Sequence, residues 1–329
     1  SQASDKIDVL IVDDGSTDHS VTVAESVATR GVAVRVIKHA SNLGLGPARN
    51  TAIAEAKGRY VMFVDSDDEV LPGALSAISE RLESSELDIM FIGTVEHKRG
   101  RDAPLHDPSA LARLAGASEP WSLSSHPELL FFPPSTWSKI FRRDFLREQH
   151  IEFPAGYHQD LPSSTEALLR AKRIGGLDYL CYRYIRRGEG SSATRSKGTE
   201  TLVRVDQIKR IRERTDISSL PSNVQLHLVA SVAMHLIWGN RAAYRTLPEN
   251  LHEELFLRSS AELHWWLAVA SPDSSIRSEP LMPTTERLKF TRSLESGDFR
   301  SWQRTMNSHA RRLRWQRRLS PSRYRVFKR

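Results

Sequence analysis

The sequence predicts an α/β fold built on a mostly parallel sheet, and three observations support this. Short strands and helices alternate from residue 7 to residue 92, as in a doubly wound parallel sheet. The runs Ile7–Val12 and Tyr60–Val64 are largely apolar without alternation, which is typical of strands buried on both faces. Each run ends in a cluster of aspartates. Because ligands of such sheets bind beyond the carboxyl ends of the strands, we expect both clusters at one edge of the sheet.

Local signals place the individual elements of this region. Asp18 is a favourable N-cap for a helix that Gly31 ends. Pro47 is a favourable first residue for the next helix, which Gly58 stops. The predicted order is strand 7–12, helix 18–30, strand 32–37, helix 48–56, strand 60–64, helix 72–83 and strand 88–92.

After residue 92 the pattern changes. Residues 94–134 are rich in Pro, Ser and His and predict an irregular loop. Order resumes with a short helix around 145–146, a helix over 161–172 and a strand over 179–184. From residue 200 only helical patterns remain, over 201–214, 223–244 and 249–266. We therefore expect two domains, an α/β domain over 1–197 and a helical region over 198–329 that ends in a basic tail.

The composition is that of a soluble globular protein, with 39% hydrophobic and 26% charged residues in a chain of 329. The longest apolar stretch, Leu228–Trp238, is too short to span a bilayer, and no signal peptide is evident. The single cysteine, Cys181, excludes an intrachain disulfide and a thiolate metal cluster. These features favour a cytoplasmic protein.

The net charge of +7 is concentrated in the tail. Residues 301–329 contain ten Lys or Arg and no acidic residue, so the preceding residues are slightly acidic. This argues against a nucleic-acid partner for the main domain. Trp302, Met306, Ala310 and Leu313 share one helical face in the tail, with arginines around it. The tail therefore predicts a helix that docks on an anionic membrane surface or a linker into a fused domain; a nucleic-acid arm is the least favoured alternative.

The aspartate clusters indicate a particular chemistry. Carboxylates as crowded as those of Asp65–Asp68 repel one another, and removing them from water costs free energy. A divalent cation shared with a phosphate-bearing ligand relieves this repulsion, and hard oxygen ligands suit Mg²⁺ or Mn²⁺. The clusters therefore predict a site for a nucleotide-linked substrate.

Six segments carry a family resemblance by their order and residues. They are Val12–Asp18; Asn42–Gly44 with Ala48–Asn50; Asp65–Asp68; Trp137–Phe141; Phe153–Gly156 ahead of Gln159–Asp160; and Tyr182–Tyr184 leading into Arg187 and Ser191. Together, residues 1–195 resemble a family 2 inverting glycosyltransferase with a GT-A fold, of the type that builds bacterial cell-wall, teichoic-acid or capsule polymers.

The resemblance implies a nucleotide-sugar donor, UDP-linked, and assigns donor-site roles. Asp14, with Asp13 beside it, would recognise the base, since a carboxylate can accept the imide N–H of uracil. Asp65, with Ser66 beside it, would hold the ribose, and Asp67 would be the ligand of Mg²⁺ or Mn²⁺ at the diphosphate. The alternatives are that Asp13 and Asp14 only cap the next turn, and that the second cluster is a solvated acidic turn.

The resemblance also implies the remaining site residues. Asp160 would be the general base that deprotonates the acceptor hydroxyl; the alternative is an N-cap of the following helix. Arg49 would reach the nucleotide, unless it pairs with Asp13 or Asp18. Arg187 and Ser191 would close over the diphosphate, unless they form a basic surface turn.

The segment Trp137–Phe141 is expected to be structural. We expect Trp137 and Phe141 to belong to the core, and Lys139 and Arg143 to be solvated charges.

Two departures from the family pattern bear on activity. The family usually shows Glu-Asp where this chain has Gln159-Asp160, and it usually begins with a nucleotide-contacting strand that precedes this sequence. That strand would lie between the strands 7–12 and 60–64, so we expect a trimmed chain with unpaired backbone groups at two strand edges.

The sequence therefore predicts inverting transfer of a sugar to a hydroxyl of a polysaccharide or cell-wall polymer. A catalytically impaired GT-A module that acts as a scaffold for a partner or fused domain is the alternative from another class. A nucleotidyltransferase is a weaker alternative, because the chain lacks a basic Gly-rich phosphate loop.

Overall fold

A computed structural model describes residues 7–28, 34–98, 100–105, 107–186, 199, 202–269 and 285–319, with side chains of the last range given for 289–309. The chain divides into two compact units. The first comprises Ser1–Arg195 with Arg210–Thr215, and the second comprises Ser196–Lys209 with Asp216–Arg329. The domain boundary expected at Lys197 lies outside the described residues.

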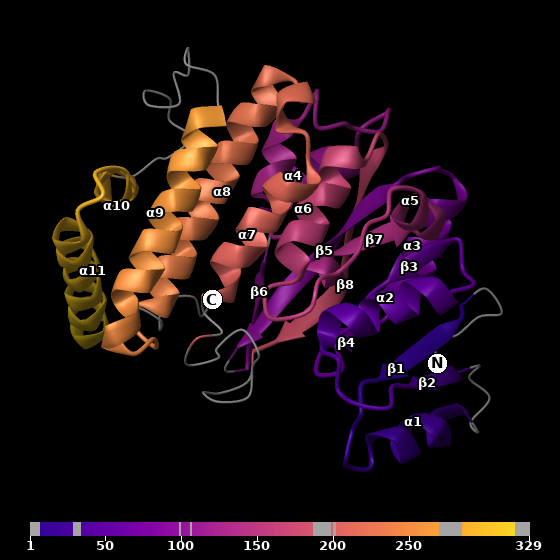
Figure 1. The fold of residues 1–329 in the computed structure, drawn as a ribbon. Helices are drawn as coiled ribbons and strands as arrows, with labels where there is room; N and C mark the ends of the chain where they lie inside the picture. Colours follow the sequence, from indigo (N-terminus) through magenta and orange to yellow (C-terminus); the bar gives the residue numbers. More distant parts are fainter. Residues whose placement is uncertain are drawn as a thin grey trace. The chain divides into compact units, whose positions relative to one another are not determined.

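The first unit alternates strands and helices, as predicted (Figure 1). Its elements are β1 (Val9–Asp13), α1 (Ser20–Ala28), β2 (Val34–Lys38), α2 (Leu45–Glu55), β3 (Tyr60–Met62), β4 (Glu69–Val70), α3 (Ala74–Glu83), β5 (Ile89–Lys98), β6 (Arg101–Pro104), α4 (Pro108–Ala115), β7 (Lys139–Arg142), α5 (Arg143–Glu148), α6 (Asp160–Arg170) and β8 (Ile174–Ile185).

The strands form two sheets, and the α/β class is confirmed. Strands β1 and β2 pair in parallel. The larger sheet has the order β3-β7-β5-β8-β4, with β6 paired to β5. Within the described residues this sheet is mixed rather than mostly parallel, because β7 runs antiparallel to both β3 and β5 while β5 and β8 are parallel. Parallel neighbours need a crossover connection. Here β5 and β6 instead form an antiparallel hairpin, and β7 follows a long segment with 3₁₀ turns.

Several predicted boundaries need correction. Helix α2 begins at Leu45, before the expected first residue, because Gly44 takes the N-cap position with φ +95°. The region predicted as an irregular loop over 94–134 holds the end of β5, strand β6 and helix α4. Helix α4 forms because Asp107 accepts a hydrogen bond from the Ser109 N–H at 3.0 Å and so caps its N-terminus.

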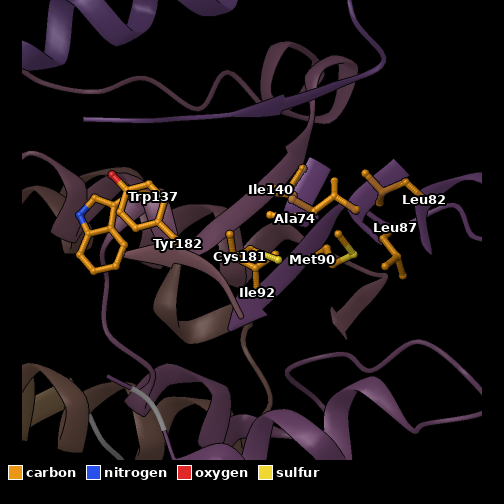
Figure 2. Packing of buried hydrophobic residues seen from close by; sticks show 10 residues of the cluster. Ala74, Leu82, Leu87, Met90, Ile92, Trp137, Ile140, Cys181 and Tyr182 are labelled. Carbon is orange, nitrogen blue, oxygen red and sulfur yellow. The ribbon is translucent and has the colours of Figure 1, made fainter. Parts of the chain in front are cut away.

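One core cluster of the first unit lies between the large sheet and α3. Figure 2 shows Trp137 and Tyr182 at one end of a buried cluster, with Leu82 and Leu87 at the other. Trp137 and Phe141 are buried, which confirms their predicted core role. The expectation for Lys139 is wrong, because its side chain is fully buried.

The second unit is helical, as predicted. Its elements are α7 (Val203–Arg214, whose last turn belongs to the first unit), α8 (Ser222–Ala243), α9 (His252–Val269), α10 (Thr285–Glu295) and α11 (Phe299–Leu319) (Figure 1). None of the described helices combines the length and apolar character needed to cross a membrane.

The described part of the basic tail is helical as far as Leu319, but its apolar face is not a free lipid-binding surface at its first turns. Trp302 has no exposed area and packs against Tyr244, Phe256 and Phe299, and Met306 is also buried. The face predicted for membrane docking therefore belongs to the core of the second unit at these positions. The side chains of residues 310 to 319 lie outside the described ones.

Candidate functional site

The first acidic cluster ties the end of β1 to the loop before α2. Asp14 accepts hydrogen bonds from the N–H groups of Leu43 (2.9 Å) and Gly44 (2.7 Å), and its other contact is Nδ1 of His39 at 2.7 Å. Although partial burial opposes the shift, these contacts hold the pKa of Asp14 below its usual range. Asp14 is therefore ionised at neutral pH and fixes the N-terminus of α2.

Asp13 makes a local contact instead. Its carboxylate oxygens lie 3.3 and 3.4 Å from the Ser16 N–H, which closes the turn after β1. The Asp18 carboxylate accepts from the Ser20 N–H at 2.9 Å, but α1 begins at Ser20, so Asp18 lies one residue before the N-cap position predicted for it.

The second acidic cluster is a tight turn between β3 and β4. The Asp68 N–H donates to the Asp65 carbonyl at 3.0 Å, so residues 65–68 form a closed β-turn. Ser66 is exposed at its tip and Asp67 is partly buried beside it. The turn thus carries three carboxylates in four residues.

Arg49 reaches this turn from α2. Its Nη2 lies 2.8 Å from Oδ1 of Asp65, and its guanidinium lies 5.7 Å from the ring centres of both Phe63 and Phe153. The side chain is 6% exposed, and among the described residues the buried Nη1 has no hydrogen-bond partner. The expected alternative partners were Asp13 and Asp18, but the ion pair forms with Asp65, because the Arg49 guanidinium lies over Phe63, two residues before Asp65.

A clamp holds α2 in this place. The Asn50 side chain donates to the Phe153 carbonyl and accepts from the Phe153 N–H, both at 2.8 Å. Gly46 permits the close approach, since a Cβ there would lie 2.0 Å from the Pro154 carbonyl oxygen.

Two residues without a predicted role, Asp68 and Tyr182, complete the turn. Asp68 accepts from the Tyr182 hydroxyl at 2.7 Å and from the Ile185 N–H at 2.8 Å, while the Asp65 N–H donates to the same hydroxyl at 3.1 Å. The available signals were the third aspartate of the cluster and the tyrosines of Tyr182–Tyr184.

The carboxylate of Asp68 is partly buried. Burial raises the pKa of Asp68 to about 6; the Ile185 N–H and the Tyr182 hydroxyl oppose this rise, and the charges of Asp67 and Asp65 add to it. A cation in this turn would favour the charged form of every carboxylate here.

Asp160 is the first residue of α6. Gln159 holds the N-cap position, so the alternative that Asp160 caps this helix is wrong. The positive end of the helix dipole favours its carboxylate form. Ser163 and Ser164 donate to the carbonyls of Glu152 and Pro134 at 2.7 and 2.5 Å, and these contacts fix the first turn of α6.

Lys139 lies within reach of the charge of Asp160. Its ammonium donates to the carbonyls of Pro133 and Ser135 at 2.7 and 2.9 Å and lies 5.1 Å from the Phe91 ring centre. Burial lowers the pKa of Lys139 to about 7, and the charge of Asp160 acts against this shift. The buried ammonium therefore holds the segment before β7 in place.

The donor set of the turn fits a magnesium or manganese ion that is shared with a ligand. Among the described residues, no three His, Cys, Asp or Glu side chains are grouped as a metal site. Mg²⁺ commonly takes only one or two carboxylates and completes its octahedron with water and substrate phosphates, and the oxygens of Asp67 and its neighbours are hard donors. Arg187 and Ser191, also predicted for this site, lie outside the described residues.

Sequence comparison identifies the first unit. Residues 1–147 match the family described as "Glycosyl transferase family 2". The chain carries a family 2 glycosyltransferase domain.

Curated relatives of this glycosyltransferase domain include bacterial proteins. The chain is 32% identical over 187 residues to "Uncharacterized glycosyltransferase EpsJ" of Bacillus subtilis, covering 56% of this chain and 54% of EpsJ. It is 29% identical over 188 residues to the Staphylococcus aureus "Poly(ribitol-phosphate) beta-N-acetylglucosaminyltransferase TarS", covering 56% and 31%. The match spans about half the length of the first curated relatives.

A solved structure shares the fold. The crystal structure of S. aureus TarS 1-349 in complex with UDP-GlcNAc aligns with a TM-score of 0.71 over 93% of this chain and 83% of that chain, at 18% identity. The family 2 domain therefore has the GT-A fold, followed by a helical C-terminal region.

Proposed function

We propose that this chain transfers a sugar from a UDP-linked donor to a hydroxyl of a polysaccharide or cell-wall polymer, with inversion at the anomeric carbon. The observation that carries the proposal is the turn 65–68, whose carboxylates are held from two sides by Arg49 and by Tyr182 with Ile185. A fixed cluster of hard oxygen donors at the end of a strand suits a metal-chelated diphosphate. The family match and the fold of the UDP-GlcNAc complex of TarS agree with such a donor.

Asp67 is proposed as the metal ligand, with Asp65 and Ser66 at the donor ribose. The ion would neutralise the charge that develops on the diphosphate leaving group. The Arg49–Asp65 ion pair compensates one negative charge of the cluster, so the turn can form before the donor binds.

Asp14 is proposed to recognise the uracil base, with Asp13 beside it. A carboxylate has about four acceptor positions. The described contacts occupy both positions of Oδ1 and one of Oδ2. The remaining position of Oδ2 can accept the imide N–H of uracil. Arg187 and Ser191 are proposed, from the sequence alone, to contact the diphosphate.

Asp160 is proposed as the general base. Its place at the N-terminus of α6 favours the ionised form that accepts a proton. Gln159 beside it is buried and neutral, so no charge is buried at the N-cap position of α6.

Titration calorimetry with UDP tests the donor site in the full chain. We expect UDP to bind in Mn²⁺ or Mg²⁺ and to bind far more weakly in EDTA. Asp67→Asn should remove the metal-dependent part of the affinity. The matched control Glu69→Gln, which changes an exposed carboxylate just outside the turn, should bind as the wild type does.

Product release from a panel of UDP-sugars tests the chemistry, with poly(ribitol phosphate) among the acceptors because TarS is named for it. Asp160→Asn should keep UDP affinity and lose about 10²–10⁴-fold in transfer rate. Asp144→Asn, a carboxylate in the first turn of α5, is the matched control. Equal rates for the two variants would contradict the role of Asp160, and the anomeric NMR signal of the product reports inversion.

A non-catalytic scaffold is the second candidate. It is favoured by Gln159 and by the separation of β1 and β2 from the larger sheet among the described strands. A wild-type chain without metal-dependent UDP binding would support the scaffold and overturn the transferase.

A further inference from the structure

Strand β8 contributes one hydroxyl to the acidic turn. The Tyr182 Oη accepts from the Asp65 N–H at 3.1 Å and donates to Oδ2 of Asp68 at 2.7 Å. A hydroxyl has one donor and two acceptor positions, so it can make both contacts at once. It therefore bridges the first and last residues of the turn that carries Ser66 and Asp67.

The hydroxyl is held in place by its ring. Tyr182 has no exposed area, and its ring stacks on Trp137 with centres 5.0 Å apart and planes 9° apart (Figure 2). The pairing of Val70 with Tyr182 fixes the register of β8 against β4. Burial raises the pKa of Tyr182, so the hydroxyl remains a donor at neutral pH.

The bridge relieves the repulsion within the turn. Three carboxylates lie within four residues, and Asp68 is the one that accepts two hydrogen bonds from β8. The hydroxyl satisfies Oδ2 of Asp68 while the Ile185 N–H satisfies Oδ1. Without the hydroxyl, a buried carboxylate oxygen would lose its donor, and the turn would relax toward water.

We propose that Tyr182 is a positioning residue for the metal–diphosphate site: its hydroxyl sets the conformation of the turn that presents Asp67. This inference rests on the proposed function. Residues that orient a ligand carboxylate typically change metal affinity 10–100-fold when they are removed.

Two tyrosines on the same strand allow a matched test. Tyr184 stacks on Trp137 as Tyr182 does, with centres 5.3 Å apart and planes 12° apart. Phenylalanine at either position keeps the stacked ring and removes one hydroxyl. Tyr182→Phe removes the bridge to the turn, whereas Tyr184→Phe leaves it intact.

The measurement is UDP affinity by calorimetry over a range of Mn²⁺ concentrations. We expect Tyr182→Phe to raise the Mn²⁺ concentration for half-maximal UDP binding by about 10-fold or more, with unchanged residual binding in EDTA. Tyr184→Phe should match the wild type. In the transfer assay, Tyr182→Phe should raise the apparent KM for the UDP-sugar at limiting Mn²⁺ more than it lowers kcat at saturating Mn²⁺.

A second variant approaches the bridge from the carboxylate side. Asp68→Asn weakens the same hydrogen bond. Adding Tyr182→Phe to Asp68→Asn should therefore lower the Mn²⁺-dependent UDP affinity less than Tyr182→Phe lowers it in the wild type. Additive effects of the two substitutions would overturn the bridge, and so would a Tyr182→Phe variant that binds Mn²⁺ and UDP as the wild type does. A wild type without metal-dependent UDP binding would overturn the proposed function and this inference together.

Discussion

Lys139 is a fully buried cation, and it is paired mainly with backbone carbonyls rather than with a carboxylate. Removing an ammonium from water costs several kcal/mol unless hydrogen bonds and neighbouring charges compensate. Burial lowers the pKa of Lys139 to about 7, so the residue loses its proton near neutral pH in the folded chain. In the unfolded chain it keeps the proton up to its ordinary value of 10.5.

This difference makes the contribution of Lys139 to stability depend on pH. Between about pH 7 and 10.5 unfolding takes up a proton, so raising the pH favours the folded state. The free energy of unfolding of the wild type relative to Lys139→Met should therefore rise by about 2 kcal/mol from pH 7 to pH 9. Urea unfolding of both proteins at several pH values measures this difference.

The control for this titration is Lys172→Met, which removes an exposed ammonium. Its difference from the wild type over the same range gives the baseline for the comparison. If the difference in the free energy of unfolding between the wild type and Lys139→Met does not change with pH, burial does not lower the pKa of Lys139, and this prediction is wrong.

At the level of residues, the sequence predicted that aspartates follow β1 and β3 better than it predicted the partners of these aspartates. Aspartates after apolar runs can be recognised because strand ends set their position, although β1 proves only partly buried rather than buried on both faces. The Arg49–Asp65 pair and the burial of Lys139 depend on which helix packs beside which strand. That information is tertiary, and residue order alone does not hold it.

Among the elements, α2 packs against residues 153 and 154 too closely for a side chain at Gly46. Its Gly46 faces the backbone of residues 153 and 154, where a Cβ would lie 2.0 Å from the Pro154 carbonyl oxygen and 2.9 Å from that of Phe153. Backbone atoms cannot rotate away as a side chain can, so any larger residue must displace the helix.

We expect Gly46→Ala to destabilise the first unit by about 1–3 kcal/mol through overpacking, despite the better helix propensity of alanine. It should also loosen the Asn50 clamp and the Arg49–Asp65 pair. The matched control is Gly116→Ala at the end of α4, where an added Cβ would lie 3.3 Å from the nearest atom. Thermal and urea unfolding compare the two, and equal stability would contradict this packing of α2.

The sequence predicted most elements of the first unit but not their pairing. Periodicity identified β1, β3 and α6 within a few residues, because apolar patterns are local. It could not predict that β7 inserts antiparallel between β3 and β5. Strand direction there depends on the connection before β7, whose Pro-rich sequence shows no regular period.

For the whole molecule, the two compact units should respond differently to the donor. Hydrogen exchange of the full chain with UDP and Mn²⁺ should slow at 13–18, 42–49 and 65–68 in the first unit. Helices α8 and α9 of the second unit should keep their exchange rates. Asp67→Asn should remove the protection that depends on Mn²⁺, and protection of α8 and α9 equal to that of 65–68 would contradict a donor site confined to the first unit.

The doubly anchored turn at residues 65–68 has a thermodynamic consequence. Arg49 from α2 and Tyr182 from β8 already restrict its backbone in the free protein. Little conformational entropy remains to be lost there when a cation and a diphosphate arrive, so preorganisation favours affinity. The calorimetric entropy of binding should then be dominated by the water that leaves the ion and the phosphates.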